Sequence, residues 1–329
     1  MDPALSREIF QLKNNDTFRE VALKVFRYQA GHNPVYREYL DALGVDPGSV
    51  NKVEKIPFLP IEFFKTHRVL CAELEPEVTF ESSGTTGMPP SRHHVADAAL
   101  YQHSFIAGFR HFYGDPAHLC ILALLPSYLE RSGSSLVYMM DHLIRLSAHP
   151  ESGFYLHNLD QLADVLQHRV KDGSPTLFMG VTFALLELAE KYPMQLGDHI
   201  TIMETGGMKG QRKELVRSEL HAMLQQAFRL PSIHSEYGMT ELLSQGYSQG
   251  QGIFRAPPWM QILVRDPNDP LTLLGPGQSG GLNVIDLANL YSCSFIATGD
   301  LGKVYEGGRF EVLGRFDHAE VRGCNLLVT

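Results

Sequence analysis

The stretch between residues 118 and 240 constrains the fold most, because short apolar runs alternate there with helical patterns. "LCILALLPS", "TLFMGV", "HITIMET" and "SIHSEYG" are apolar runs of strand length, and "TFALLELAEKY" and "QRKELVRSELHAMLQQAF" are helical patterns that follow the second and third. Such alternation is typical of a largely parallel sheet covered by helices. The predicted fold class is therefore α/β.

The segments on either side have other patterns. Residues 1 to about 45 have spaced aromatic residues between polar ones, which predicts helices, and "KIPFLPIEFFKTH" is typical of an irregular apolar connector. After about residue 255, "MQILVRD", "GLNVIDL", "GKVYEG" and "RFEVLGR" are short alternating strands separated by turns. We therefore predict an α/β region over residues 1–255 and an antiparallel, β-rich subdomain over residues 256–329.

The composition limits the classes of partner. The chain has 329 residues, 44% of them hydrophobic, a net charge of −9 and no basic run, so nucleic acid and anionic membranes are not expected as main partners. No apolar run reaches the length of a membrane span, and the amphipathic N-terminus has no signal-peptide core, so a cytoplasmic location is expected. The four cysteines lie far apart, which favours neither a zinc site nor a disulfide framework.

Six small residues, Ser82–Gly87, follow the extended run Val78–Phe80. Glycines allow close approach of the backbone to a ligand, and converging N–H groups and hydroxyls suit a phosphate. No Gly-Lys-Ser/Thr follows, so this is not a Walker A loop. The residues alone leave two alternatives open, an anion-binding loop and a flexible surface loop.

Two more small-residue loops, Gly206–Gly210 and Gly238–Glu241, follow predicted strands. We expect all three loops beyond the carboxyl ends of the strands, where ligands bind in open α/β sheets. Near the last loop, the ring of Tyr237 can stack on a base, and the side chains of Thr240 and Glu241 can reach phosphate and Mg²⁺. Each of these residues alone is more often structural.

Two further patterns lie in the β-rich segment. "FIATGDLG" places Asp300 just after an apolar strand, where a carboxylate can accept hydrogen bonds from a ribose diol, although aspartates in turns are common. "GPGQSG", residues 275–280, matches GxGxxG, but it contains Pro276 and a strand follows where a dinucleotide fingerprint needs a helix. A hairpin turn is expected there.

Four motifs in order, "SSGTTG", "YGMTE", "TGD" and "GRFDHAEVRG", resemble those of the adenylate-forming (AMP-binding) superfamily. "LPSYLERSGSSLVYMM", "ETGGMKG" and "GRFDHAEVRGCNLL" resemble more closely its acyl-protein synthetase (LuxE-like) branch. The resemblance runs from about Phe58 to the end. It implies the large domain of an adenylate-forming enzyme with a β-rich C-terminal subdomain that ends at the hinge motif, and without the C-terminal lid domain.

The resemblance also implies an activity and its residues. A carboxylic acid, with fatty acids as the expected class, would attack ATP in the presence of Mg²⁺, giving an acyl-adenylate whose acyl group passes to a thiol. Residues 1–255 would then be the nucleotide- and acyl-binding region. Thr240 would act at the phosphate, Glu241 would hold Mg²⁺, and Cys324 would carry the acyl thioester. The implied ATP- and AMP-binding residues are Ser82, Ser83, Gly84, Thr85, Thr86, Gly87, Gly206, Gly207, Met208, Tyr237, Gly238, Met239, Thr240, Asp300 and Arg315.

The sequence departs from the family pattern in two places. The phosphate loop continues Gly87-Met88-Pro89-Pro90 and lacks the usual lysine, for which Arg92 and Lys209 are candidates. We also expect the usual lid with its catalytic lysine to be absent. For the acyl-carrier role the Cys324 thiol must be present as the reactive thiolate. The alternative is that Cys324 is a buried, inert residue.

Other nucleophiles and metal ligands are less favoured. Cys71, Cys120 and Cys293 lie in or beside apolar runs and are expected in the core. The pair His93-His94 has the wrong spacing for two metal ligands on one face, so solvated or capping roles are expected.

Three functions stay open at this point. The first is an acyl-protein synthetase with an acyl-accepting partner protein, either a reductase or a carrier protein. The second is an acyl- or aryl-CoA ligase, and the third is a non-catalytic nucleotide-binding subunit of a multienzyme complex.

Overall fold

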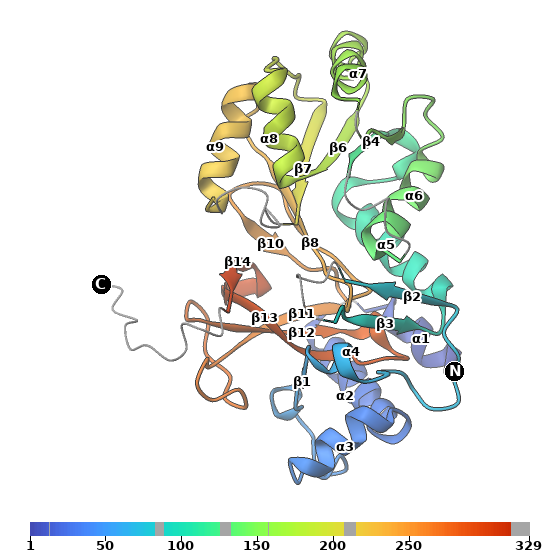
Figure 1. The fold of residues 1–329 in the computed structure, drawn as a ribbon. Coiled ribbons are helices and arrows are strands. Elements are labelled where there is room, and N and C mark those ends of the chain that lie inside the picture. Colours follow the sequence, from blue (N-terminus) through green and yellow to red (C-terminus); the bar gives the residue numbers. More distant parts are fainter. Residues whose placement is uncertain (13, 83–88, 126–132, 157, 207–214, 317–329) are drawn as a thin grey trace. The chain divides into compact units, whose positions relative to one another are not determined.

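The computed structural model describes residues 1–12, 14–82, 89–125, 133–156, 158–206 and 215–316 (Figure 1). They form two compact units. Unit 1 contains Met1–Glu73 and the described residues from Pro258 onward, and unit 2 is Leu74–Pro257. No helix in these ranges is long and apolar enough to cross a membrane.

The division differs from the predicted one at the N-terminus. The predicted boundary at residues 255/256 lies close to the end of unit 2, but the first 73 residues group with the C-terminal β segment. The reason is packing in unit 1. The Gln29 amide nitrogen donates to the carbonyl oxygens of Asn289 and Leu290 and to the Ser294 hydroxyl. The helix Asn15–His32 is therefore bound to the residues just before the strand Phe295–Val304.

Unit 2 is built on the predicted parallel sheet. Its strands in chain order are β4 Cys120–Leu124, β5 Gly153–Phe154, β6 Thr176–Val181, β7 Ile200–Thr205, β8 His234–Tyr237, β9 Gly246–Ser248 and β10 Ile253–Arg255. In space they run β5-β4-β6-β7-β8-β9-β10. The pairs from β5 to β8 are parallel, and β9 and β10 are added antiparallel. The four sequence runs that predicted strands thus form four neighbouring strands, β4, β6, β7 and β8.

Helices cover both faces of this sheet (Figure 1). They are α5 Ala98–Tyr113, α6 Ser135–Ser147, α7 Leu159–Asp172, α8 Thr182–Lys191 and α9 Arg217–Phe228, with the 3-10 turn η2 at Pro116–His118. His221 of α9 contacts Ser235, whereas Tyr113 of α5 contacts His234. Because successive strand residues point to opposite faces, α5 and α9 lie on opposite faces of β8.

Local signals explain the helix limits. Asn158 caps α7 by accepting a hydrogen bond from the Gln161 N–H, and Gly173 ends it in the left-handed conformation with φ 74°. The helix predicted from Gln211 begins, among the described residues, at Arg217, after Val216 in an extended conformation.

The strand before the small-residue loop does not belong to the parallel sheet, contrary to the prediction. β2 Val78–Glu81 pairs with β3 Arg92–Val95 in a separate antiparallel two-stranded sheet. The sequence showed β2 as an extended run but contained no signal for its partner. The loop from residue 82 therefore connects a hairpin and does not extend the parallel sheet.

Unit 1 combines N-terminal helices with an antiparallel sheet. The helices are α1 Pro3–Ile9, α2 Asn15–His32, α3 Pro34–Ala42 and the short α4 Phe63–Thr66. The strands are β1 Leu59–Pro60, β11 Met260–Arg265, β12 Ser279–Asp286, β13 Phe295–Val304 and β14 Phe310–Arg315. The 3-10 turns are η1 Val53–Lys55, η3 Leu287–Asn289 and η4 Glu306–Gly308. β11 to β14 are antiparallel neighbours, as predicted, and β1 adds to β13 in parallel.

The GxGxxG match is a turn between β11 and β12, as expected. Gly277 has φ 82°, in the left-handed region that favours glycine, and a Cβ at Gly280 would collide with the backbone oxygen of Arg265. The two glycines are therefore explained by the hairpin itself.

Candidate active site

The turn after β8 holds the motif Tyr237–Glu241 at the carboxyl edge of the parallel sheet. Tyr237 and Glu241 are buried, and Thr240 is half-buried. The Leu242 N–H donates to the Met239 carbonyl at 3.1 Å, which closes the turn. This is where the sequence predicted the end of a strand followed by a ligand-binding loop.

Tyr237 packs on the α9 face of the sheet. Its ring meets that of Phe254 edge to face, with centroids 6.1 Å apart, and the Arg217 guanidinium lies 5.0 Å from the Phe254 centroid. Arg217 also pairs with the buried Glu204 at 3.1 Å. Burial opposes ionisation of Glu204, but the His221 hydrogen bond and the Arg217 charge outweigh it and lower the pKa of this carboxyl.

His93 was predicted to be solvated or capping, and this was wrong. Its side chain is fully buried, and its Nδ1 lies 2.8 Å from the Thr240 carbonyl oxygen. Burial lowers the His93 pKa to about 4, so the ring is neutral at physiological pH. A carbonyl oxygen only accepts, so Nδ1 carries the proton and donates to it. The hydrogen bond thus ties β3 to the turn that contains Thr240.

The small-residue loop is described only at its first residue. The Ser82 N–H donates to the Ser91 carbonyl at 3.0 Å, and the Ser91 N–H donates to the Ser82 hydroxyl oxygen at 2.9 Å. Ser82 therefore closes the neck of the β2–β3 hairpin. Ser83, Gly84, Thr85, Thr86 and Gly87 lie outside the described residues.

Arg92 and Lys209 are the two candidates for the cation of this loop. Arg92 pairs with Glu81 across the hairpin at 3.1 Å, and both side chains are exposed. Lys209 lies outside the described residues, as do Gly207 and Met208. Gly206 ends the described part of that loop with φ 71°, and its carbonyl accepts a hydrogen bond from the Thr182 hydroxyl at 3.0 Å.

Asp300 and Arg315 are brought together in unit 1. Asp300 was predicted just after a strand, but it lies inside β13, directly opposite Arg315 of β14. The Arg315 Nε is 3.3 Å from Oδ1 of Asp300. Asp300 is buried, with 7% of the residue exposed, whereas the Arg315 side chain is 82% exposed. The strand continues beyond Asp300 because β14 pairs with it, a long-range contact that the local sequence does not show.

Sequence reasoning missed Glu236, one residue before Tyr237. It is buried, and the Thr205 hydroxyl donates to its Oε2. Burial raises the pKa of this carboxyl to about 7, and the neighbouring Glu204 adds to the effect. The only signal in the sequence was a charged residue within a predicted buried strand.

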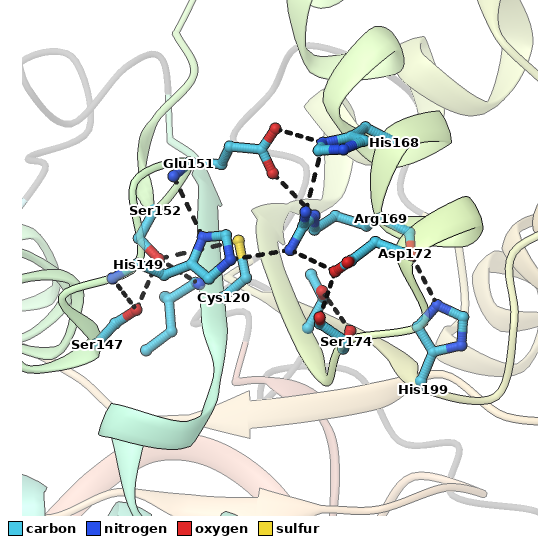
Figure 2. A network of polar contacts seen from close by, with 12 residues as sticks. Cys120, Ser147, His149, Glu151, Ser152, His168, Arg169, Asp172, Ser174 and His199 are labelled. Atoms are coloured by element: carbon cyan, nitrogen blue, oxygen red, sulfur yellow. Dashed lines mark hydrogen bonds and ion pairs between the residues drawn. The ribbon is translucent and has the colours of Figure 1, made fainter.

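A second polar cluster, at the amino edge of the sheet, surrounds Arg169 (Figure 2). The ligand atoms of Cys120, His149 and Glu151 lie close enough together for a metal ion. However, the buried Arg169 guanidinium already contacts two of these three residues, 2.9 Å from His149 Nε2 and 2.8 Å from Glu151 Oε2. This positive charge does not fit a metal, so we interpret the cluster as a structural ion-pair network.

The described cysteines are where they were predicted. Cys71, Cys120 and Cys293 are free and buried, and burial raises the pKa of each thiol. None is therefore a ready thiolate. Cys324 lies outside the described residues.

Comparison with known proteins identifies the family. A family model described as acyl-protein synthetase, LuxE, matches residues 156–329, which is more than half of the chain. This chain belongs to the LuxE acyl-protein synthetase family. A curated relative, a long-chain-fatty-acid–luciferin-component ligase from Photorhabdus luminescens, is 37% identical over 71 residues, which are 21% of this chain and 60% of that protein.

Solved structures show the fold. MatB from Rhodopseudomonas palustris with bound ATP matches 72% of this chain and 47% of its own, at 18% identity and a TM-score of 0.55. This chain thus spans about half of MatB. A 2-hydroxyisobutyryl-CoA ligase in complex with 2-HIB-AMP and CoA matches 96% of this chain and 69% of its own, at 16% identity and a TM-score of 0.66. The predicted family and the predicted fold of an adenylate-forming enzyme are confirmed.

Proposed function

We propose that this LuxE-family protein is an ATP- and Mg²⁺-dependent acyl-activating enzyme. A carboxylate oxygen of the substrate acid attacks the α-phosphorus of ATP, and the bond to pyrophosphate breaks, which gives an acyl-adenylate. A thiolate then attacks the acyl carbonyl carbon, and AMP leaves with the electrons of the broken carbon–oxygen bond. Long-chain fatty acids are the proposed substrate class, because the curated relative is a ligase of such acids.

One observation carries the proposal. The turn Gly238–Glu241 lies at the carboxyl edge of a parallel sheet, the edge at which α/β folds bind ligands, and the neutral His93 holds its Thr240 carbonyl. A fixed turn can orient an N–H and a hydroxyl toward phosphate without reorganisation. Family membership supports the same conclusion from an independent source.

The residues take the following roles in this proposal. Tyr237 offers its ring to adenine on the α9 face, and Thr240 contacts phosphate. Mg²⁺ would be held by Glu241, because this hard cation prefers carboxylate oxygens, and it would neutralise charge on the phosphates. Ser82 to Gly87 contribute donors to phosphate, and Gly206, Gly207, Met208, Gly238 and Met239 line the nucleotide.

The ribose contacts are a separate part of the proposal. Asp300 would accept hydrogen bonds from the ribose hydroxyls. Its pairing with Arg315 at 3.3 Å orients the carboxylate, which such an acceptor needs. An Asp300→Asn variant tests this part by itself, with a weakened affinity for ATP as the expected result.

The acyl acceptor is proposed to be Cys324, from which the acyl group passes to a partner reductase or carrier protein. The buried, high-pKa thiols of the other three cysteines support this choice by exclusion among the protein's own thiols. Coenzyme A is the alternative acceptor, since a solved structure that shares this fold is a CoA ligase.

The test is pyrophosphate exchange with ATP, Mg²⁺ and a panel of carboxylic acids, with and without the proteins encoded beside this one. Exchange that depends on one class of acid is the expected result. Intact mass then separates the acceptors: an acyl adduct on the parent protein that is lost in Cys324→Ala supports the thioester, and free acyl-CoA supports the alternative. ATP binding without exchange for any acid would overturn catalysis and favour a nucleotide-binding subunit.

A further inference from the structure

Arg217 contacts both ends of a row of side chains that crosses the sheet. The row consists of successive cross-strand partners on β7, β8, β9 and β10, namely Glu204, Ser235, Ser248 and Phe254. Residues paired in this way point to the same face of a sheet, which here is the face covered by α9. The two serines in the middle are small and fully buried, so the row has large side chains only at its ends.

The Arg217 side chain connects these two ends. Its Nε lies 3.1 Å from Oε1 of the buried Glu204, and its guanidinium carbon lies 5.0 Å from the centre of the Phe254 ring. The turn between β9 and β10 packs against the stem, because a Cβ at Gly252 would lie only 3.3 Å from Cδ of Arg217. The guanidinium is therefore held by a carboxylate and by an aromatic face.

The position of Arg217 in its helix is unfavourable for a cation. It is the first residue of α9, and the N-terminus of a helix disfavours positive charge. In α5 and α7, by contrast, arginine lies in the last turn, where the helix dipole favours it. Glu204 balances the charge of Arg217, but charge balance does not require the contact with Phe254, so that contact points to a role outside the helix.

Phe254 transmits the constraint to Tyr237. The two rings meet edge to face, with an interplanar angle of 66° and centroids 6.1 Å apart. Tyr237 follows Ser235 by two positions on β8, so it lies on the same face and one step closer to the carboxyl end of the strand. Edge-to-face packing fixes the orientation of both rings, and a ring that stacks on a base must be held at a defined angle.

We propose that Arg217 is a positioning residue for ATP: it holds Phe254, which sets the angle at which the Tyr237 ring meets adenine. This inference rests on the proposed role of Tyr237 and adds the support behind that ring. The alternative is that Arg217 itself neutralises phosphate. The structure favours positioning, because the buried Glu204 already balances the charge of the guanidinium.

The experiment measures the calorimetric affinity of the full-length protein for ATP and for inorganic tripolyphosphate, both with Mg²⁺. Arg217→Met keeps the stem but removes the guanidinium, and Phe254→Leu keeps the ion pair but removes the ring. Each should weaken ATP binding by about 10-fold, the scale of one aromatic or cation–π contact, and leave tripolyphosphate binding unchanged. In pyrophosphate exchange, KM for ATP should rise while kcat and KM for the acid stay within about twofold.

Two double variants sharpen the test. Arg217→Met added to Phe254→Leu should weaken ATP binding no further, because Arg217 acts through Phe254. Glu204→Gln combined with Arg217→Met leaves no unpaired buried carboxylate, so it should fold even if Arg217→Met alone does not, and it should show the same loss for ATP.

Arg169→Met is the matched control, since it removes a buried ion pair at the other edge of the same sheet and should leave ATP affinity unchanged. An equal loss in this control, equal losses for ATP and tripolyphosphate, additive losses in the Arg217 and Phe254 double variant, or parental ATP affinity in every variant would each overturn the inference while the proposed function stands. If the parent protein binds no ATP, the proposed function fails, and the inference fails with it.

Discussion

The Nδ1 atom of His93 lies 2.8 Å from the carbonyl oxygen of Thr240, although 147 positions separate the two residues in the chain. The hydrogen bond connects a hairpin strand to the turn at the end of β8. Since the ring is buried and neutral, it donates one defined hydrogen bond and brings no charge close to the proposed phosphate site.

Replacement of His93 by Phe should lower pyrophosphate exchange by about 10- to 100-fold, because an unpaired buried carbonyl costs about 1–3 kcal/mol and frees the turn to move. KM for ATP should rise more than KM for the acid. A His93→Gln variant, which retains an N–H donor, should recover part of the activity.

The control for this prediction is His94→Ala on the same strand. The His94 ring is half-buried, and its Nδ1 lies 2.9 Å from the Thr79 hydroxyl oxygen. The His94→Ala variant should keep a pyrophosphate-exchange rate within about threefold of that of the parent protein. Equal losses in the His93 and His94 variants would show that the hairpin acts only through general stability.

Glu236 makes the stability of the fold dependent on pH. Its pKa is about 7 in the folded protein against an ordinary value of 4.5, so the folded state holds the proton more tightly. The stabilisation from this group is therefore complete below pH 4.5 and is lost as pH rises through 7, by up to about 3 kcal/mol.

Glu236→Gln cannot titrate and should lack this part of the pH dependence. Urea unfolding of both proteins between pH 5 and 8.5 measures it: the wild type should lose stability relative to the variant as pH rises. The groups around Glu236 do not imitate the effect, since burial keeps Tyr113 and Tyr247 neutral and Glu204 has a lowered pKa. A difference independent of pH would contradict the assignment.

Arg169 should be a major determinant of the stability of unit 2 (Figure 2). Its side chain is 4% exposed and pairs with Glu151 at 2.8 Å and Asp172 at 3.0 Å. Arg169→Met leaves these carboxylates without their cation and should cost about 3 kcal/mol. Arg145→Met removes an exposed pair with Asp141 and should cost less than about 1 kcal/mol, and denaturant unfolding compares the two.

The cluster around Arg169 also gives a prediction about metal. Added zinc should not raise the melting temperature of the parent protein, because the Arg169 guanidinium already pairs with His149 and Glu151, two of the three candidate ligands. Stabilisation by zinc that is lost in Cys120→Ser would refute the ion-pair interpretation.

Tyr247→Phe should not destabilise the protein. The Tyr247 hydroxyl is buried and makes no hydrogen bond within the described residues, so its removal takes away a desolvated group without breaking a contact. The expected change is between zero and a gain of about 1 kcal/mol. A loss of more than about 1 kcal/mol in chemical unfolding would show that this hydroxyl has a partner in solution.

Local patterns in the sequence were sufficient for the parallel strands β4, β6, β7 and β8, for helix α8 and for the antiparallel strands near the C-terminus. Hydrophobic periodicity and turn residues act within a few positions, so they can be recognised without knowledge of the fold. The order of the four motifs was likewise enough for the family, and the match to the LuxE model confirms it.

Only the tertiary structure decided which distant residues meet. It placed β2 in a hairpin with β3 and not in the parallel sheet, put Asp300 inside a strand opposite Arg315, and buried His93 against Thr240. It also showed that two similar glutamates differ, since Glu204 meets Arg217 and Glu236 meets Thr205. The sequence specifies which side chains are ionisable. Their protonation states and partners depend on burial and on long-range contacts, which exist only in the folded chain.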